Sequence, residues 1–93
     1  MKYDVEKVLY LADQDKGLNV SLDEKEGTDL DNRVKALLSA KMIELVASDD
    51  SDNYYKITKK GKIKLLKMQI EYRSKHGKAI DLHQLELDEL ENA

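Results

Sequence analysis

Apolar side chains recur along the chain with two different periods. A spacing of three or four residues, typical of one face of an α-helix, occurs in three segments, residues 4–13, 28–42 and 58–75. Alternation of apolar with polar residues, typical of a half-buried strand, occurs in three shorter segments, residues 18–22, 43–45 and 55–57. The pattern therefore predicts three helices and three extended segments.

Polar residues at the segment boundaries define where helices begin. Thr28 and Thr58 each precede a helical segment, where a threonine oxygen can accept a hydrogen bond from a free backbone N–H of the first turn. Ser21 followed by Glu24 forms the pattern of a capping box. The sequence therefore predicts a further helix of about one turn, which starts at Ser21 and ends at Gly27.

A β-hairpin is predicted between the second and third extended segments. A run of turn-forming residues from Asp49 to Asn53 separates them. Most of these side chains are aspartates, so the hairpin has an acidic tip.

The last helical segment, residues 58–75, carries two apolar stripes. Placed at about 100° per residue, the stripes lie on roughly opposite sides of the helix. One stripe contains Ile63, Leu66 and Ile70, and the other contains Leu65, Met68 and Tyr72. We expect the first stripe to pack on the domain core. The second stripe then needs the C-terminal segment or a second copy of the chain, which predicts a homodimer interface at Leu65, Met68 and Tyr72.

Composition limits the class of protein. A chain of 93 residues is about one small domain. The absence of cysteine excludes a disulfide framework and a zinc–thiolate site, and it favours the cytoplasm. No apolar run approaches the roughly 20 residues of a membrane span. Asp4 and Glu6 fall where a signal peptide would be basic and then apolar. We therefore expect a cytoplasmic domain that neither spans a membrane nor is exported.

Charge is strongly segregated along the chain. Residues 1–53 hold 7 basic and 13 acidic side chains, residues 54–78 hold 9 and 1, and residues 79–93 hold none and 5. These blocks favour a domain over residues 1–78 and an acidic amphipathic tail over residues 79–93. We expect a helix in that tail, over residues 80–90, and we hypothesise that its carboxylates compete with nucleic acid for the lysines of the basic block.

The order of the predicted elements resembles a winged helix-turn-helix domain. Five apolar residues resemble the end of a recognition helix that enters a wing, namely Val34, Leu37, Leu38, Met42 and Ile43. Residues 55–61, Tyr-Lys-Ile-Thr-Lys-Lys-Gly, resemble a wing strand that leads into the last helix. The resemblance, to regulators of the MarR and PadR kind, covers about residues 5–72. It implies a mainly α fold with a small β-hairpin, in the order α-β-α-α-β-β-α with a C-terminal helical tail.

The resemblance implies a transcription regulator that binds duplex DNA. In such domains the third helix enters the major groove and the wing contacts phosphates or the minor groove. The residues of this chain that fall on the solvent side or flank of that helix are Asn32, Arg33, Lys35 and Ser39. The lysines that would hold phosphates are Lys56, Lys59, Lys60 and Lys62. The resemblance also implies a homodimer through the last helix.

Carboxylates depart from this resemblance. Asp29 and Asp31 open the expected recognition helix, and Asp49, Asp50 and Asp52 occupy the wing tip. Both groups would be repelled by phosphates. A winged-helix module that binds a protein partner instead of DNA, through these acidic surfaces, is therefore the alternative. A structural dimer that scaffolds a larger assembly through its long helices is a third interpretation.

Candidate chemistry for an enzyme is missing from the sequence. No serine stands in a nucleophile-elbow context, no glycine-rich phosphate loop occurs, and no carboxylate pair marks a pocket. Asp50 and Asp52 resemble the start of a calcium loop, but Tyr54 and Tyr55 stand where an oxygen ligand and a glycine are needed. We therefore expect no catalytic residues, no metal and no cofactor.

Overall fold

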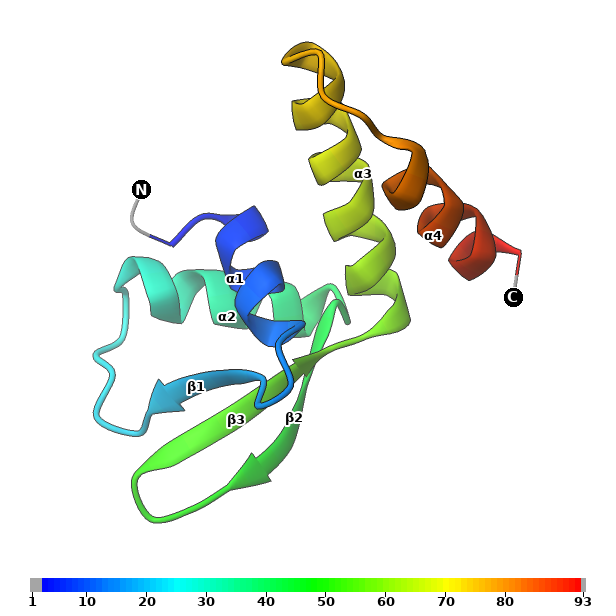
Figure 1. The fold of residues 1–93 in the computed structure, drawn as a ribbon. Coiled ribbons are helices and arrows are strands. Elements are labelled where there is room, and N and C mark those ends of the chain that lie inside the picture. Colours follow the sequence, from blue (N-terminus) through cyan, green and yellow to red (C-terminus); the bar gives the residue numbers. More distant parts are fainter. Residues whose placement is uncertain (1–2, 93) are drawn as a thin grey trace.

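Four helices and a three-stranded antiparallel sheet make up the described chain, residues 3–92 of a computed structural model (Figure 1). The elements in chain order are α1 (Val5–Ala12), β1 (Leu18–Ser21), α2 (Asp29–Ser39), β2 (Ile43–Ser48), β3 (Asp52–Ile57), α3 (Lys59–Lys75) and α4 (Asp81–Glu91). Residues 1–2 of the predicted domain (residues 1–78) and residue 93 of the predicted tail (residues 79–93) lie outside the described part. The observed class is mixed α/β, in the order α-β-α-β-β-α-α.

Side-chain caps fix the starts of three helices. Asp4 Oδ1 accepts from Lys7 N at 2.8 Å and starts α1. Thr28 Oγ1 accepts from Asp31 N at 3.2 Å, and Thr58 Oγ1 accepts from Gly61 N at 3.1 Å. The two predicted threonine caps are therefore confirmed.

The predicted one-turn helix between Ser21 and Gly27 is wrong. Ser21 ends β1, and the residues that follow form turns instead of a helix. Ser21 Oγ accepts from Asp23 N, only two residues on, at 3.1 Å. The Glu24 carboxylate does not reach back; its Oε1 accepts from Thr28 Oγ1 at 2.6 Å. One helical turn fixes several backbone angles for a single hydrogen bond. The side chains of this segment therefore satisfy the backbone and the next helix cap without a helix.

The sheet has the strand order β1-β3-β2, so β3 is central. Leu18 of β1 pairs with Tyr55 of β3, and Ile43 of β2 pairs with Ile57. The register shifts by a bulge between Leu45 and Ala47 on β2. The predicted hairpin is confirmed, and the predicted extended segment 18–22 joins it as a third strand.

The core lies between α1, α2, the start of α3 and one face of the sheet. Its buried residues form one cluster, composed of Val8, Leu9, Ala12, Leu18, Val20, Val34, Leu37, Ile43, Tyr55 and Leu65. Beyond this cluster α3 runs away from the sheet, and α4 folds back along it (Figure 1). The predicted tail helix is confirmed as α4.

Leu65 and Leu66 of α3 are buried differently from the prediction. Leu65 belongs to the core cluster and is 1% exposed. Leu66 is equally buried but lies outside that cluster. Farther along, α3 packs against α4, in which Leu87 is buried. The prediction that Leu65 is available to a second copy is therefore wrong.

A close backbone approach at the start of α3 explains why Leu65 faces the core. Thr58 N donates to Met42 O at 3.0 Å, and Thr58 Oγ1 donates to Lys41 O at 2.7 Å. A Cβ atom at Gly61 would overlap Met42 O and lie 2.8 Å from Ile57 Cγ1. Glycine therefore allows α3 to contact the turn between α2 and β2. Leu65, one turn later on the same face, is directed into the core.

We expect Gly61→Ala to lower the free energy of unfolding by roughly 1–3 kcal/mol, because the added methyl group meets backbone that cannot move cheaply. Helix propensity alone predicts the opposite sign, a gain of about 1 kcal/mol. Urea unfolding followed by circular dichroism measures the difference. Lys64→Ala, at an exposed position of the same helix, is the control and should change little. A Gly61→Ala variant as stable as the wild type would contradict the close approach.

Candidate functional site

The outer face of α2 carries the residues predicted to read DNA. Asn32, Lys35 and Ser39 are exposed on this helix, and Arg33 is half-buried. Asn32 Nδ2 donates to Gly27 O at 3.2 Å. Lys35 Nζ lies 3.0 Å from Asp31 Oδ2 and 3.7 Å from Glu26 Oε1.

These contacts pair the one ammonium of that face and leave the face with a net negative charge. A hydrogen bond from the Gly27 backbone N–H, together with Lys35, holds the pKa of Asp31 below its ordinary value. The hydrogen bond to Asp31 in turn raises the pKa of Lys35. Both groups are therefore charged at neutral pH, and the single ammonium on this face is matched by two carboxylates, Asp31 and Glu26.

Lys56 is held by the turn between α1 and β1. Its Nζ donates to Gln14 O at 3.0 Å and also to Asp15 O. Lys56 is half-buried on β3, and this ammonium joins the turn to the sheet. The structure thus gives Lys56 a structural contact in place of the free position that phosphate binding needs.

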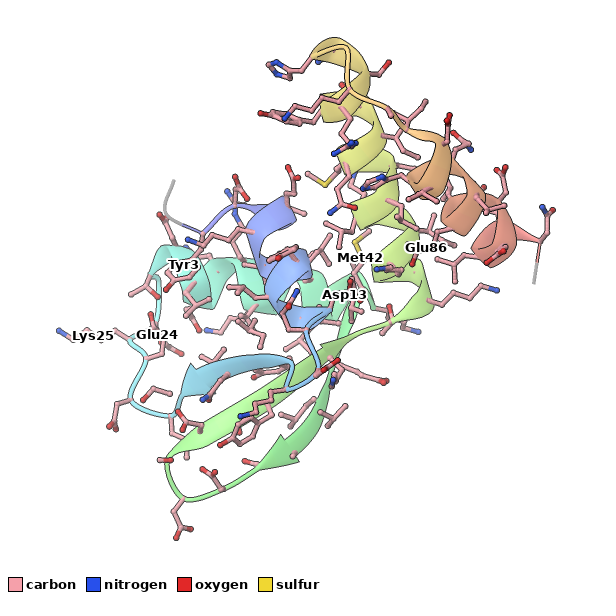
Figure 2. The ribbon with its side chains drawn as sticks, in the orientation of Figure 1. Tyr3, Asp13, Glu24, Lys25, Met42 and Glu86 are labelled. Carbon is pink, nitrogen blue, oxygen red and sulfur yellow. The ribbon has the colours of Figure 1, made fainter. Side chains whose placement is uncertain are left out.

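Lys62 lies between α1 and α4. Its Nζ is 2.6 Å from Asp13 Oδ2, at the C-terminal end of α1, and 3.4 Å from Glu86 Oε2 of α4. Asp13 and Glu86 are both labelled in Figure 2. Burial lowers the pKa of Lys62, but the hydrogen bond to Asp13 and the charges of Asp13 and Glu86 outweigh burial, so this pKa is raised. Lys62 therefore joins three helices.

We expect Lys62→Met to lower the free energy of unfolding by roughly 1 kcal/mol, because it leaves two carboxylates without their shared cation. Lys64→Met is the matched control, since Lys64 is exposed and makes no ion pair with residues 3–92. Urea unfolding of both variants measures the difference. Equal stabilities of the two variants would contradict a stabilising role for this ion-pair cluster.

A basic surface remains on α3. Lys59 and Lys60, in its first turn, are exposed, and so are Lys64 and Lys67 farther along. Within the described chain, Lys60, Lys64 and Lys67 have no carboxylate partner. Of the lysines predicted to hold phosphates, Lys59 and Lys60 are therefore the two at this surface, and Lys64 and Lys67 extend it.

The acidic hairpin tip is held together by Asp49. Its Oδ1 accepts from the backbone N–H groups of Ser51 and Asp52, each at 2.8 Å. Tyr54 Oη donates to Asp49 Oδ2 at 2.8 Å. The Ser51 N–H hydrogen bond, followed by those from Tyr54 and Asp52, lowers the pKa of Asp49 from 3.8 to about 2. Asp49 is therefore ionised at neutral pH and caps its own turn.

The lowered pKa predicts a pH-dependent contribution of Asp49 to stability. This contribution is present above the unfolded pKa of 3.8 and is lost as the pH falls through the folded value of about 2. We expect Asp49→Asn to lower the Tm at pH 7, and its difference from the wild type to shrink at pH 2. Thermal melts at the two pH values measure this. Asp50→Asn, which removes a neighbouring carboxylate, should show no such change, and a constant gap for Asp49→Asn would contradict the assignment.

The other two residues of the predicted dimer interface lie beyond Leu65 on α3. Met68 is half-buried, while Tyr72 is half exposed. The Tyr72 ring lies against His76, with ring centroids 4.4 Å apart, and the Lys78 ammonium is 5.4 Å from the Tyr72 ring centroid. Contacts within the chain thus occupy part of this predicted interface.

A pocket that the sequence did not indicate lies between α2 and the sheet. Its volume is about 270 Å³. It is lined by Val20, Ser21, Leu22, Glu24, Asp31, Val34, Lys35, Leu38, Asn53 and Tyr55. The pocket borders the turns that replace the predicted one-turn helix. The alternation of Leu22 with its neighbours and the pattern of Ser21 with Glu24 marked this segment in the sequence, but neither indicated a pocket. Its walls come from separate elements, β1, α2 and β3, that only the fold brings together.

Comparison with known proteins adds no likeness. No family model matches the chain, and neither does any curated protein or solved structure. Within residues 3–92 no helix is long and apolar enough to cross a membrane, and no three potential ligand side chains gather as a metal site. Function must therefore be inferred from the geometry alone.

Proposed function

We propose that the chain is a winged-helix module that binds a protein partner through the exposed face of α2 and the acidic hairpin tip. The order α2, hairpin, α3 and the pairing of β1 with β3 support the winged-helix assignment. Residues 22–28 form turns where a winged-helix domain has its second helix. This departure leaves α2 without the usual support of a DNA-reading helix.

The observation that carries this proposal is that the exposed ammonium of α2 is already paired within the chain. Lys35 is bound to Asp31 and Glu26, and Asn32 is bound to the backbone of Gly27. Duplex DNA is bound largely by cations that neutralise phosphates. A helix whose one exposed ammonium is already matched by carboxylates offers little to phosphates, whereas a mixed polar surface suits a protein partner.

Duplex DNA is the second candidate, and a different surface favours it. Lys60, Lys64 and Lys67 are exposed on α3 without carboxylate partners among the described residues. These ammonium groups are free to contact phosphates. DNA binding of this kind would use α3, with α2 playing a smaller part than the winged-helix resemblance implies.

Site-specific photo-crosslinking distinguishes the two candidates. A photo-reactive side chain replaces Ala36, exposed on α2, in one variant and Lys64 in a matched variant. In cells that express the protein, we expect Ala36 to give a protease-sensitive adduct of one discrete size, and Lys64 to give much less of it. Nuclease-sensitive adducts from Lys64, with none of protein from Ala36, would overturn the proposal in favour of DNA.

Homodimerisation remains part of the proposal with a changed surface. Leu65 is buried within the chain, so a second copy would contact Tyr72 and the exposed leucines of α4. Leu82 is 81% exposed and Leu85 is 55% exposed.

A further inference from the structure

The pocket between α2 and the sheet combines apolar walls with carboxylates. The apolar walls come from Val20, Leu22, Val34, Leu38 and Tyr55, and the carboxylates are those of Glu24 and Asp31. Leu22 is half exposed, so the apolar lining is continuous with the surface. Glu24, labelled in Figure 2, lies on the turn segment between β1 and α2.

The size of the pocket limits its occupant. Small-molecule and cofactor pockets usually measure about 300–1,000 Å³. At about 270 Å³ this pocket falls just below that range. It is therefore better suited to one long side chain from a partner than to a cofactor.

The carboxylates keep free hydrogen-bonding capacity. Glu24 Oε1 accepts from Thr28 Oγ1, but Glu24 Oε2 has no partner in the described chain. Asp31 Oδ2 accepts from Gly27 N and from Lys35, while Asp31 Oδ1 has none there. The Asp31 side chain is only 17% exposed. An ionised carboxylate has about four acceptor sites, so both groups can accept more donors.

The surroundings of the pocket are acidic. Residues 21–35 contain five acidic and three basic side chains. Leu22 N donates to Ser51 O at 2.9 Å, which joins this segment to the hairpin tip and its three aspartates. The Lys35 ammonium forms an ion pair with the Asp31 carboxylate, and the Lys35 side chain is 58% exposed. The local charge thus favours a cation.

We propose that this pocket receives a lysine or arginine side chain from a basic segment of the protein partner. The apolar walls hold the aliphatic stem, and Glu24 and Asp31 accept hydrogen bonds from the charged head. This inference rests on the proposed protein-binding function and assigns the chemistry that the partner must present.

A titration with single amino-acid amides tests the pocket without the partner. The full chain, labelled with ¹⁵N, is titrated with Nα-acetyl-arginine amide, Nα-acetyl-lysine amide and Nα-acetyl-norleucine amide, and NMR shifts are recorded. We expect the two cationic probes to shift the backbone signals of Leu22, Val34 and Asn53. Norleucine, which has the stem without the charge, should bind more weakly.

A pair of variants separates the pocket from general acidity. Glu24→Gln keeps an oxygen that can accept from Thr28 Oγ1, so the turn is preserved while the charge is lost. Asp50→Asn removes one charge at the hairpin tip, outside the pocket lining. We expect Glu24→Gln to weaken arginine-amide binding about threefold, as for a partly exposed ion pair, and Asp50→Asn to leave it unchanged.

Two outcomes would overturn the pocket assignment. One is the absence of localised shifts with the cationic probes. The other is equal weakening by Glu24→Gln and Asp50→Asn, which would show diffuse attraction to an acidic surface. Either outcome, obtained together with a protein adduct from Ala36, removes the pocket but leaves the proposed function. Localised probe binding without any protein adduct from Ala36 would support the pocket but remove the proposed function.

Discussion

The contact between the first turn of α3 and the carbonyl group of Met42 determines how the rest of the chain is arranged. Because Gly61 has no side chain, α3 approaches the turn between α2 and β2 more closely than any other residue would allow. This approach directs Leu65 into the core and leaves Lys62 in reach of Glu86 on α4. This backbone contact, together with Leu65 in the core and the ion pair of Lys62 with Asp13, holds α3 against the sheet and α1.

Pairing within the fold resolves only part of the charge segregation along the sequence. Lys35 and Lys62 each contact two carboxylates, and Lys56 contacts backbone carbonyl oxygens. Individual surface ion pairs contribute little to stability, but they decide which charges a partner can meet. What remains is an acidic surface on α2 and the hairpin tip and a basic surface on α3. The two candidate functions follow from these two surfaces.

Local signals predicted much of the fold. Thr28 and Thr58 cap the helices that their positions indicate, and the hairpin lies where turn residues separate two alternating segments. Tertiary contacts decided the rest. Glu24 is bound by Thr28 and forms no capping box, and periodicity could not reveal which stripe of α3 faces the core. Lys62 and Asp13 are 49 residues apart, so no local pattern could show that this candidate phosphate ligand is already bound.

Among the helices of residues 3–92, α4 buries the fewest of its own residues. This helix buries Leu87 alone among its own residues, and no side chain caps its start at Ile80. Regions with few buried apolar contacts open at a lower free energy than the core. An opening that released α4 from α3 would separate Lys62 from Glu86 and leave its ion pair with Asp13 in place. The charge that α3 presents to a partner therefore depends on whether α4 is packed against it.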